Sequence, residues 1–367
     1  MHMSAASKEV QRVMTFCNAC RYCEGYCAVF PAMELRRTFS SQDLSYLANL
    51  CHNCRDCYYA CQYTPPHEFE LNIPKTMAEL RLETYREFCW PKGFRGLFKR
   101  NVLTLVLAIL VCFAVIFGTM LMFQGKEVVF SNHTGSAAFY KIIPYQVLVT
   151  VPVTIALLVL LVVAKEFATF WRRTGGSLPS FLNLRAHGIA VTDVLFLKYL
   201  EGGGQGCTYP DGQFSMVRRW LHHLVFYGFA LCFGATVLAA FYEHFLHLTS
   251  PFPVFSLPVI LGTIGGIAIL LGTAGLLYLK TKLDRAPASG KFTAMDVGFL
   301  ILLFMVSLTG LLLLIFRETP AMGTLLAVHL GFVAVFFLTA PYGKFVHAIF
   351  RYAALVKNAD EQIQAKL

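Results

Sequence analysis

Long apolar runs separated by shorter polar stretches fill the chain from Val102 onward, whereas residues 1 to about 95 are polar. Six such runs cover residues 102–123, 145–164, 221–242, 257–279, 296–316 and 322–340. Each has close to the ~20 residues that a helix needs to cross a hydrocarbon core of about 30 Å. Because a segment in lipid must satisfy its backbone hydrogen bonds internally, these runs are predicted to be helices. The pattern therefore predicts a mainly α protein, with an N-terminal domain at 1–95 and a six-helix transmembrane domain at 96–367.

Basic residues are concentrated in alternate connections between the apolar runs. They precede the first run, fill the second-to-third connection, and follow the fourth and sixth runs; examples are Lys92, Arg95, Arg172, Arg218, Lys280, Arg285, Lys344 and Arg351. The remaining connections carry few lysines or arginines. Because positive charge is retained on the cytoplasmic side, both termini are predicted to be cytoplasmic and the protein to lie in a bacterial inner membrane.

The connection at about 165–220 is too long for a simple turn. Its residues 186–200 are predicted to form a cytoplasmic helix at the membrane interface, and Gly202, Gly203 and Gly204 are predicted to end it. The glycine-rich stretch that follows has neither the strand–loop–helix setting nor the lysine of a phosphate-binding loop, so no nucleotide site is predicted there.

Composition supports a membrane protein. Hydrophobic residues make up 56% of the 367 positions and charged residues only 14%, too few to cover the surface of a soluble domain of this length. The net charge of +10 raises the possibility of a nucleic-acid partner. Because the basic residues flank apolar runs, they are better explained as topology signals, and no nucleic-acid binding is predicted.

The cysteines carry the strongest chemical signal. Eight of the twelve form a repeated motif, Cys17-x2-Cys20-x2-Cys23-x3-Cys27 and Cys51-x2-Cys54-x2-Cys57-x3-Cys61, with Arg21 matched by Arg55. This is the spacing of two-cluster ferredoxins, in which three close cysteines and a distant fourth hold each [4Fe–4S] cluster. We therefore assign Cys17, Cys20, Cys23 and Cys61 to one cluster, and Cys51, Cys54, Cys57 and Cys27 to the second.

Two features limit this assignment. Proline does not follow the fourth cysteine of each motif directly but comes four residues later, at Pro31 and Pro65. This departure weakens the prediction that the two clusters exchange their fourth ligands. The alternative to iron is structural zinc, which is typically held by two Cys-x2-Cys pairs without an evenly spaced third cysteine. Cys89, Cys112, Cys207 and Cys232 are interpreted as buried apolar side chains or ordinary loop thiols.

Histidines in or beside the apolar runs are candidate axial ligands of haem b. His329 and His347 would lie on one face, about five turns apart, if the sixth helix continued past Pro341. The third run begins with His222 and His223 and ends with His244. Because the third and sixth helices are antiparallel, His222 or His223 would pair with His347 near the cytoplasm, and His244 with His329 on the far side. One haem is expected and a second is possible; simple hydration of the interfacial histidines is the alternative.

These motifs together resemble the tricarballylate/citrate utilisation protein B family (TcuB/CitB). The resemblance covers nearly the whole chain, and rests on the doubled cysteine motif, RRWLHHLVFYGFALCF (218–233), MDVGF…LTGLLLL (295–314) and HLGFVAVFFLTAPYGKFVH (329–347). It implies two [4Fe–4S] clusters and haem b in a protein that reoxidises the reduced flavin of an FAD-dependent tricarballylate dehydrogenase (TcuA). The haem part is also similar to the nitrate reductase gamma subunit, in which one helix bears two histidines at the separation of His329 and His347.

The function expected from the sequence is electron transfer from a partner flavoprotein to membrane quinone, with the dehydrogenase active site in the partner. A membrane transporter of citrate or tricarballylate is the alternative. A carrier is expected to have repeated, broken helices and basic residues at the midplane, whereas the six runs contain almost no lysine or arginine in their interiors. A redox sensor would need an output domain, and none is recognisable after Leu355.

Overall fold

The computed structural model describes residues 3–98 and 101–365, and in this part of the chain it is helical, without a β-strand. The helices are α1 (Ala5–Cys20), α2 (Val29–Glu34), α3 (Ser41–Leu50), α4 (Asp56–Tyr59), α5 (Ile73–Phe88), α6 (Asn101–Val129), α7 (Tyr145–Arg173), α8 (Leu178–Phe181), α9 (Leu184–Leu195), α10 (Val217–Phe245), α11 (Leu257–Thr281), α12 (Gly290–Phe316), α13 (Met322–Thr339) and α14 (Val346–Gln364). Short 3-10 turns join several of them. The predicted mainly α class is confirmed.

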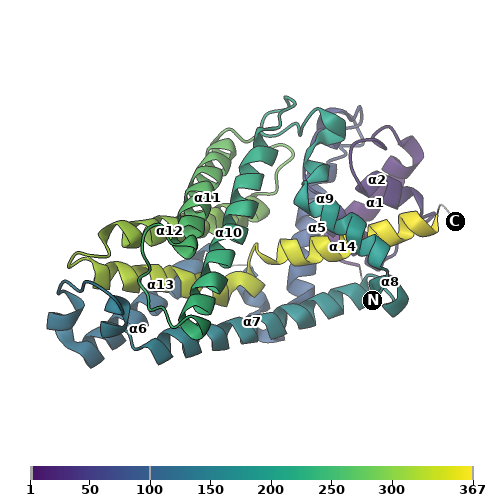
Figure 1. The fold of residues 1–367 in the computed structure, drawn as a ribbon. Helices are drawn as coiled ribbons and strands as arrows, with labels where there is room; N and C mark the ends of the chain where they lie inside the picture. Colours follow the sequence, from purple (N-terminus) through teal and green to yellow (C-terminus); the bar gives the residue numbers. More distant parts are fainter. Residues whose placement is uncertain (1–2, 99–100, 366–367) are drawn as a thin grey trace.

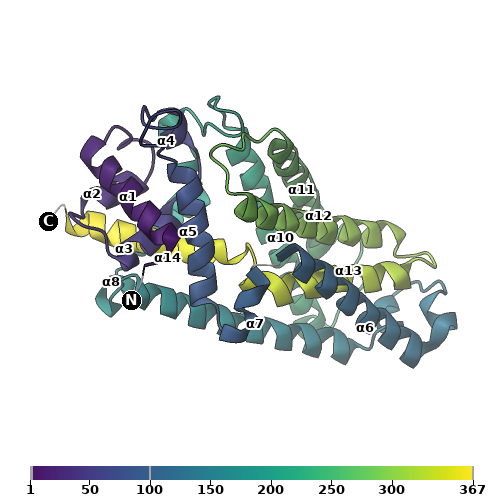
Figure 2. The ribbon, with the colours of Figure 1, turned by 180° about the vertical axis from the view of Figure 1, so that it is seen from behind.

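Six helices, α6, α7 and α10 to α13, are long and apolar enough to cross a membrane. They coincide with the six apolar runs of the sequence, which confirms the predicted number of spans. In Figure 1, α6 and α10 to α13 lie toward one end of the molecule, and the N-terminal helices occupy the other. Helix α7 runs along both parts, as the view from behind also shows (Figure 2).

Small residues allow α10 and α11 to approach closely. A methyl group added at Gly265 would lie 2.7 Å from the carbonyl oxygen of Gly228, and one added at Gly272 would lie 2.8 Å from that of Leu221. Such contacts between backbones are how membrane helices associate when lipid provides no hydrophobic driving force. The backbones of α10 and α11 are therefore in direct contact at these glycines.

Side chains cap the N-termini of two helices in the N-terminal region. Ser40 and Asp43 form a capping box at α3, and the Asn72 side chain accepts a hydrogen bond from the backbone of Lys75 at α5. Its core is shared with distant parts of the chain, because buried residues of α1, α3 and α5 pack with those of α9 and α14. Arg36 joins these parts through ion pairs to Asp43 (2.7 Å) and Glu361 of α14 (2.6 Å).

The sixth long helix does not continue to His347, so the expectation of one helix carrying His329 and His347 is wrong. Helix α13 ends at Thr339, a 3-10 turn covers Ala340–Tyr342, and α14 begins at Val346. Pro341 has no N–H to donate to the preceding turn, and its ring crowds the carbonyl of the fourth residue before it. After this break α14 packs against the N-terminal region, where it contacts α2 and α3 (Figures 1 and 2).

The long connection before α10 contains the expected helix in a shorter form. Helix α9 ends at Leu195 rather than at residue 200, and Leu197 adopts a left-handed conformation (φ 46°) that separates it from a 3-10 turn at Lys198–Leu200. Gly202 to Gly204 form the next turn, with φ values of 53°, 70° and 111°. The location of α9 at a membrane interface and the domain boundary near residue 95 stay predictions.

Candidate cofactor-binding sites

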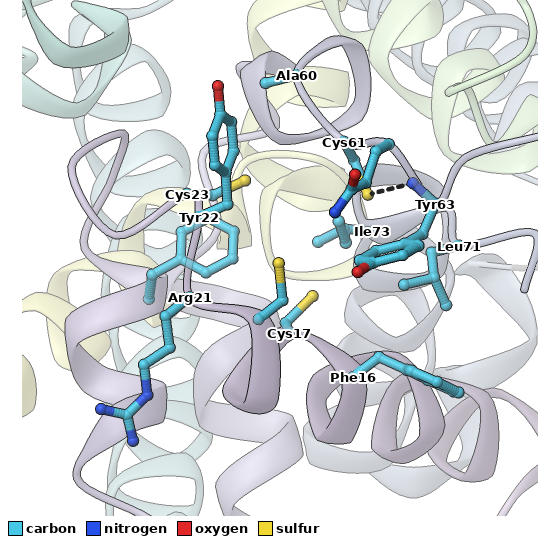
Figure 3. Close-up of a pocket in the computed structure, with 13 residues that line it drawn as sticks. Phe16, Cys17, Arg21, Tyr22, Cys23, Ala60, Cys61, Tyr63, Leu71 and Ile73 are labelled. Carbon is cyan, nitrogen blue, oxygen red and sulfur yellow. Dashed lines mark hydrogen bonds between the residues drawn. The ribbon is translucent and has the colours of Figure 1, made fainter.

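Four of the eight motif cysteines surround one cavity in the N-terminal region. Cys17, Cys20 and Cys23 of the first motif and Cys61 of the second line a space of about 240 Å³ (Figure 3). Cys17 and Cys23 are buried, Cys61 is half-buried and Cys20 is exposed. This is the set that the spacing assigned to the first cluster, and it forms because the end of the second motif returns to α1.

The other four cysteines form a second group deeper in the protein. Cys51, Cys54 and Cys57 are buried, and Cys27 of the first motif lies beside them. Burial, followed by the neighbouring Cys27 and Cys51 thiols, raises the pKa of Cys57 well above its usual value. In the first group, burial raises the pKa of Cys17 and Cys23 to about 12, with smaller effects from the other sulfurs of the group. Thiolates at these depths need a positive partner such as iron.

The two cysteine motifs share backbone conformation as well as sequence spacing. Arg21 and Arg55, each following the second cysteine of its motif, both have positive φ values, 57° and 79°. Backbone N–H groups point at sulfur in both groups, from Asn53 to Cys51 and from Tyr63 to Cys61, each at 3.4 Å. Donors of this kind stabilise charge on cysteine sulfur and tune a bound cluster.

The residues fit two iron–sulfur clusters, because each group has four thiols drawn from both motifs and a backbone N–H that donates to one of its sulfurs. Across residues 3–98 and 101–365, the structure gathers no three His, Cys, Asp or Glu side chains tightly enough for a single metal ion. A cubane bonds each thiolate to a different iron, so its ligands do not have to converge on one point. That these eight cysteines bind iron stays a prediction.

A loop before α10 covers the second cysteine group, and sequence reasoning missed its role. Thr208 donates from its backbone N–H (2.6 Å) and its hydroxyl (2.9 Å) to Asp56 Oδ1. The fully buried Cys207 lies beside Cys54, which raises the pKa of the Cys54 thiol through a hydrogen bond between the two sulfurs. The sequence carried no signal for this contact, because Cys207 lies outside both motifs.

His222 and His347 face each other near this loop. Their ring centroids are 6.5 Å apart and the ring planes are inclined by 73°. First-row metals bind imidazole nitrogen at about 2 Å, so two rings on opposite sides of one metal have centroids roughly 6 Å apart. The observed separation therefore fits axial ligation of a haem iron by this pair.

The environment of His347 prepares it as a ligand. Its Nδ1 lies 2.7 Å from the backbone carbonyl oxygen of Lys344, so Nδ1 carries the proton and Nε2 is the nitrogen with a free lone pair. Burial, followed by the charges of Lys344 and Arg351, lowers the pKa of His347 well below its usual value. It is therefore a neutral imidazole at pH 7, the form that binds metals.

His223 lies on a different side of α10. Its ring contacts Trp220 at 5.8 Å and Tyr227 at 5.7 Å, measured between centroids, and no contact with His347 is recorded among the described residues. Of the two neighbouring candidates, the structure therefore brings His222 and not His223 to His347.

The second predicted histidine pair is not in contact. His244 is exposed, and its Nδ1 lies 3.0 Å from the hydroxyl of Tyr145. His329 packs on α12, where its Nδ1 lies 3.2 Å from the Thr309 hydroxyl and its ring covers Gly310. The two rings therefore have separate partners, and a second haem between them stays a prediction.

Comparison with known proteins assigns the whole chain. A family model described as citrate utilization protein B matches residues 96–366, and one described as the citrate utilization protein B Fer4-like domain matches residues 10–87. The chain belongs to the citrate utilization protein B family. It is 45% identical over 361 residues to citrate utilization protein B of Escherichia coli, covering 98% of this chain and 93% of the relative.

The family assignment confirms the resemblance inferred from the sequence motifs. All eight motif cysteines lie within the residues matched by the Fer4-like domain, which supports iron–sulfur binding in the N-terminal region. No solved structure matches the chain.

Proposed function

We propose that this chain is a membrane electron-transfer protein that reoxidises the reduced FAD of a partner dehydrogenase, similar to tricarballylate dehydrogenase, and delivers the electrons to membrane quinone. Two [4Fe–4S] clusters and haem b, when bound, supply one-electron carriers that suit the stepwise unloading of a two-electron flavin. The proposal also places the protein in the bacterial inner membrane with both termini in the cytoplasm.

The observation that carries this proposal is the exchange of cysteines between the two motifs. Cys61 joins Cys17, Cys20 and Cys23, and Cys27 joins the group of the second motif. Two interlocked sets of four thiols in adjacent positions are the arrangement expected of a two-cluster electron carrier. The Escherichia coli relative is named for citrate utilization, which is consistent with a partner that oxidises a tricarboxylate.

The depths of the two groups give the proposed path a direction. Cys20 is exposed at the first group, whereas Cys51, Cys54 and Cys57 are buried in the second. Arg218 of α10 donates to the backbone carbonyls of His52 (3.2 Å) and Asn53 (2.7 Å) beside the second group. Electrons from a soluble partner would therefore enter on the Cys20 side and leave toward α10 and His222.

The purified full-length protein provides the test. We expect a broad absorption that dithionite bleaches, together with sharp bands of reduced haem b, iron in excess of haem, and no stoichiometric zinc. Reduction by the partner dehydrogenase with its substrate, followed by reoxidation with a quinone analogue, tests the direction of transfer. A colourless protein, or one that contains zinc in place of iron, contradicts the proposal.

A transport assay separates this function from the alternative. Vesicles containing the protein should show no uptake of labelled citrate or tricarballylate above empty vesicles. Uptake by a variant in which Cys20 and Cys54 are both replaced by alanine would establish a carrier that does not depend on the redox centres.

A further inference from the structure

Positive charge without carboxylate partners gathers beside His222 and His347, on the buried Arg81 and the half-buried Arg218 and Arg351. Arg81, Arg218 and Arg351 all reach this region, and none of them is within 4.0 Å of a carboxylate in the part of the chain that the structure describes. The nearby carboxylate of Asp296 is already paired with Lys280 (2.9 Å) and Lys344 (2.6 Å). The sulfurs of Cys51 and Cys54 lie near Arg351 and Arg218 and would offset part of this charge as cluster ligands. The positive charge that is left favours an anionic group on the side of the histidines.

Two of these arginines are placed one helical turn from the histidine pair. Arg218 precedes His222 by four residues on α10, and Arg351 follows His347 by four residues on α14. Residues four apart lie on the same face of a helix, with Cβ atoms about 5–6 Å apart. Each histidine therefore has an arginine beside it on its own helix.

Both arginines reach toward the same loop. Arg351 Nη2 donates to the carbonyl oxygen of Cys51 at 2.8 Å, and Arg218 donates to those of His52 and Asn53. The carbonyls of residues 51–53 take only part of the hydrogen-bonding capacity of the two arginines. Arg351 keeps a buried Nε that has no partner, and a guanidinium carries five N–H donors.

Arg81 contacts α3 and the cysteine loop through two of its guanidinium nitrogens. Its Nε donates to the carbonyl of Ala48 (2.7 Å) and its Nη2 to that of Cys51 (2.5 Å), and its guanidinium covers the ring of Phe292. It therefore belongs to the support of the cysteine loop. Arg218, whose guanidinium also covers the ring of Tyr209, and Arg351 differ from Arg81 in lying one helical turn from a histidine of the pair, and neither forms an ion pair with the described residues.

We infer that Arg218 and Arg351 bind the two propionate carboxylates of a haem held between His222 and His347. The planar fork of a guanidinium matches a carboxylate better than any other side chain does. Because the same arginines hold the backbone of residues 51–53, they fix the haem edge next to the second cysteine group. This inference rests on the haem of the proposed function and adds the residues that orient it.

Haem dimethyl ester, in which both propionates are masked, tests the inference on the unaltered chain. The protein is produced in full length in a host unable to make haem, and is then titrated in detergent with haem or with its dimethyl ester. We expect the ester to bind at least about tenfold more weakly, since a hydrogen bond to a charged group contributes roughly 1.4 kcal/mol or more. Equal binding of both would overturn the inference.

Variants assign the effect to the two arginines. Arg218→Gln and Arg351→Gln should each reduce haem retention on washing and lower the haem midpoint potential, and together they should abolish the preference for haem over its ester. Arg219→Gln is the matched control, because Arg219 is on the same turn of α10 but pairs with Glu201 at 2.6 Å. An equal loss in this control would show a general effect of charge and refute the assignment.

The possible outcomes distinguish a failure of the arginine assignment from a failure of the proposed haem binding. If the unaltered protein takes up neither haem nor ester, the haem of the proposed function is wrong and the inference fails with it. If it takes up haem with wild-type retention and potential in both arginine variants, only the assignment of Arg218 and Arg351 fails. The signal of the cluster near Cys17, whose cysteines neither arginine contacts, should be unchanged in either variant, which checks that the protein is folded.

Discussion

The ring centroids of His222 and His347 lie 6.5 Å apart, although α10 and α14 are far apart in the chain and α14 is not one of the six long apolar helices. The break after α13 makes this possible, because it allows α14 to turn toward the N-terminal region. The haem site proposed here is therefore at the junction of the bundle with the cysteine-rich region. Four predictions follow from this arrangement and from the packing around it.

Replacing one member of each cysteine group should remove one cluster at a time. Cys61→Ala should lose the cluster near Cys17 and keep the second, whereas Cys54→Ala should lose the second and block haem reduction by the partner. Iron per chain should fall by about half in both, and electron paramagnetic resonance of the reduced protein should show which signal remains. Cys112→Ala, outside both groups, is the control. If Cys61→Ala instead perturbs the signal that Cys54→Ala removes, the assignment is wrong.

Removing an axial imidazole should separate haem from iron–sulfur binding. His347→Ala should lose the low-spin haem spectrum while retaining the iron of both clusters, because His347 lies outside the two cysteine groups. Absorption spectra and metal analysis of the same preparation measure both quantities. His223→Ala should keep its haem, since His223 contacts Trp220 and Tyr227 instead. An unchanged haem content in His347→Ala would refute this ligand assignment.

After iron removal, the free energy of unfolding should decrease as the pH rises into the alkaline range. Burial raises the pKa of Cys17 and Cys23 to about 12, above the value near 9 that each has when exposed. As the pH rises, these thiols therefore lose their protons in the unfolded chain before they do so in the folded one. The free energy of unfolding of the iron-free protein should be constant below about pH 8. Above pH 9 the free energy of unfolding should fall by about 1.4 kcal/mol per pH unit for each such thiol.

Urea unfolding of the iron-depleted protein between pH 7 and 10.5 measures this slope. The iron-loaded protein is the control, because its sulfurs are already bound as thiolates. A flat profile in the iron-depleted form would show that these thiols are not buried without their clusters.

A methyl group between α10 and α11 should destabilise the bundle. In Gly265→Ala the new carbon would lie 2.7 Å from the carbonyl oxygen of Gly228, so the two backbones must separate. We expect a loss of about 1–3 kcal/mol, typical of overpacking, measured by thermal unfolding in detergent. Gly234→Ala, which meets no atom within 4 Å, should be neutral or slightly stabilising. Equal stability of both variants would mean that this close approach does not form.

Much of the architecture was accessible from local patterns. Each span is specified by its own run of apolar residues, because lipid leaves a helix as the only backbone arrangement without unsatisfied groups. The main error of the prediction was to miss the helix break near Pro341, because the apolar sequence continues through the proline whereas the α-helix ends before it. Helix α9 was also predicted five residues too long at its C-terminal end, since the left-handed residue Leu197 leaves no compositional signal.

The sequence alone identified the candidate ligands of the sites. Thiols at a fixed spacing and imidazoles beside apolar runs are local features, so the cofactors that they predict can be inferred before any folding is considered. The spacing also grouped Cys61 with Cys17. Only the tertiary structure decided that His222 rather than His223 faces His347, and that Arg351 of α14 meets the loop after Cys51. Such meetings depend on how helices distant in the chain pack, and packing depends on side chains from several helices at once.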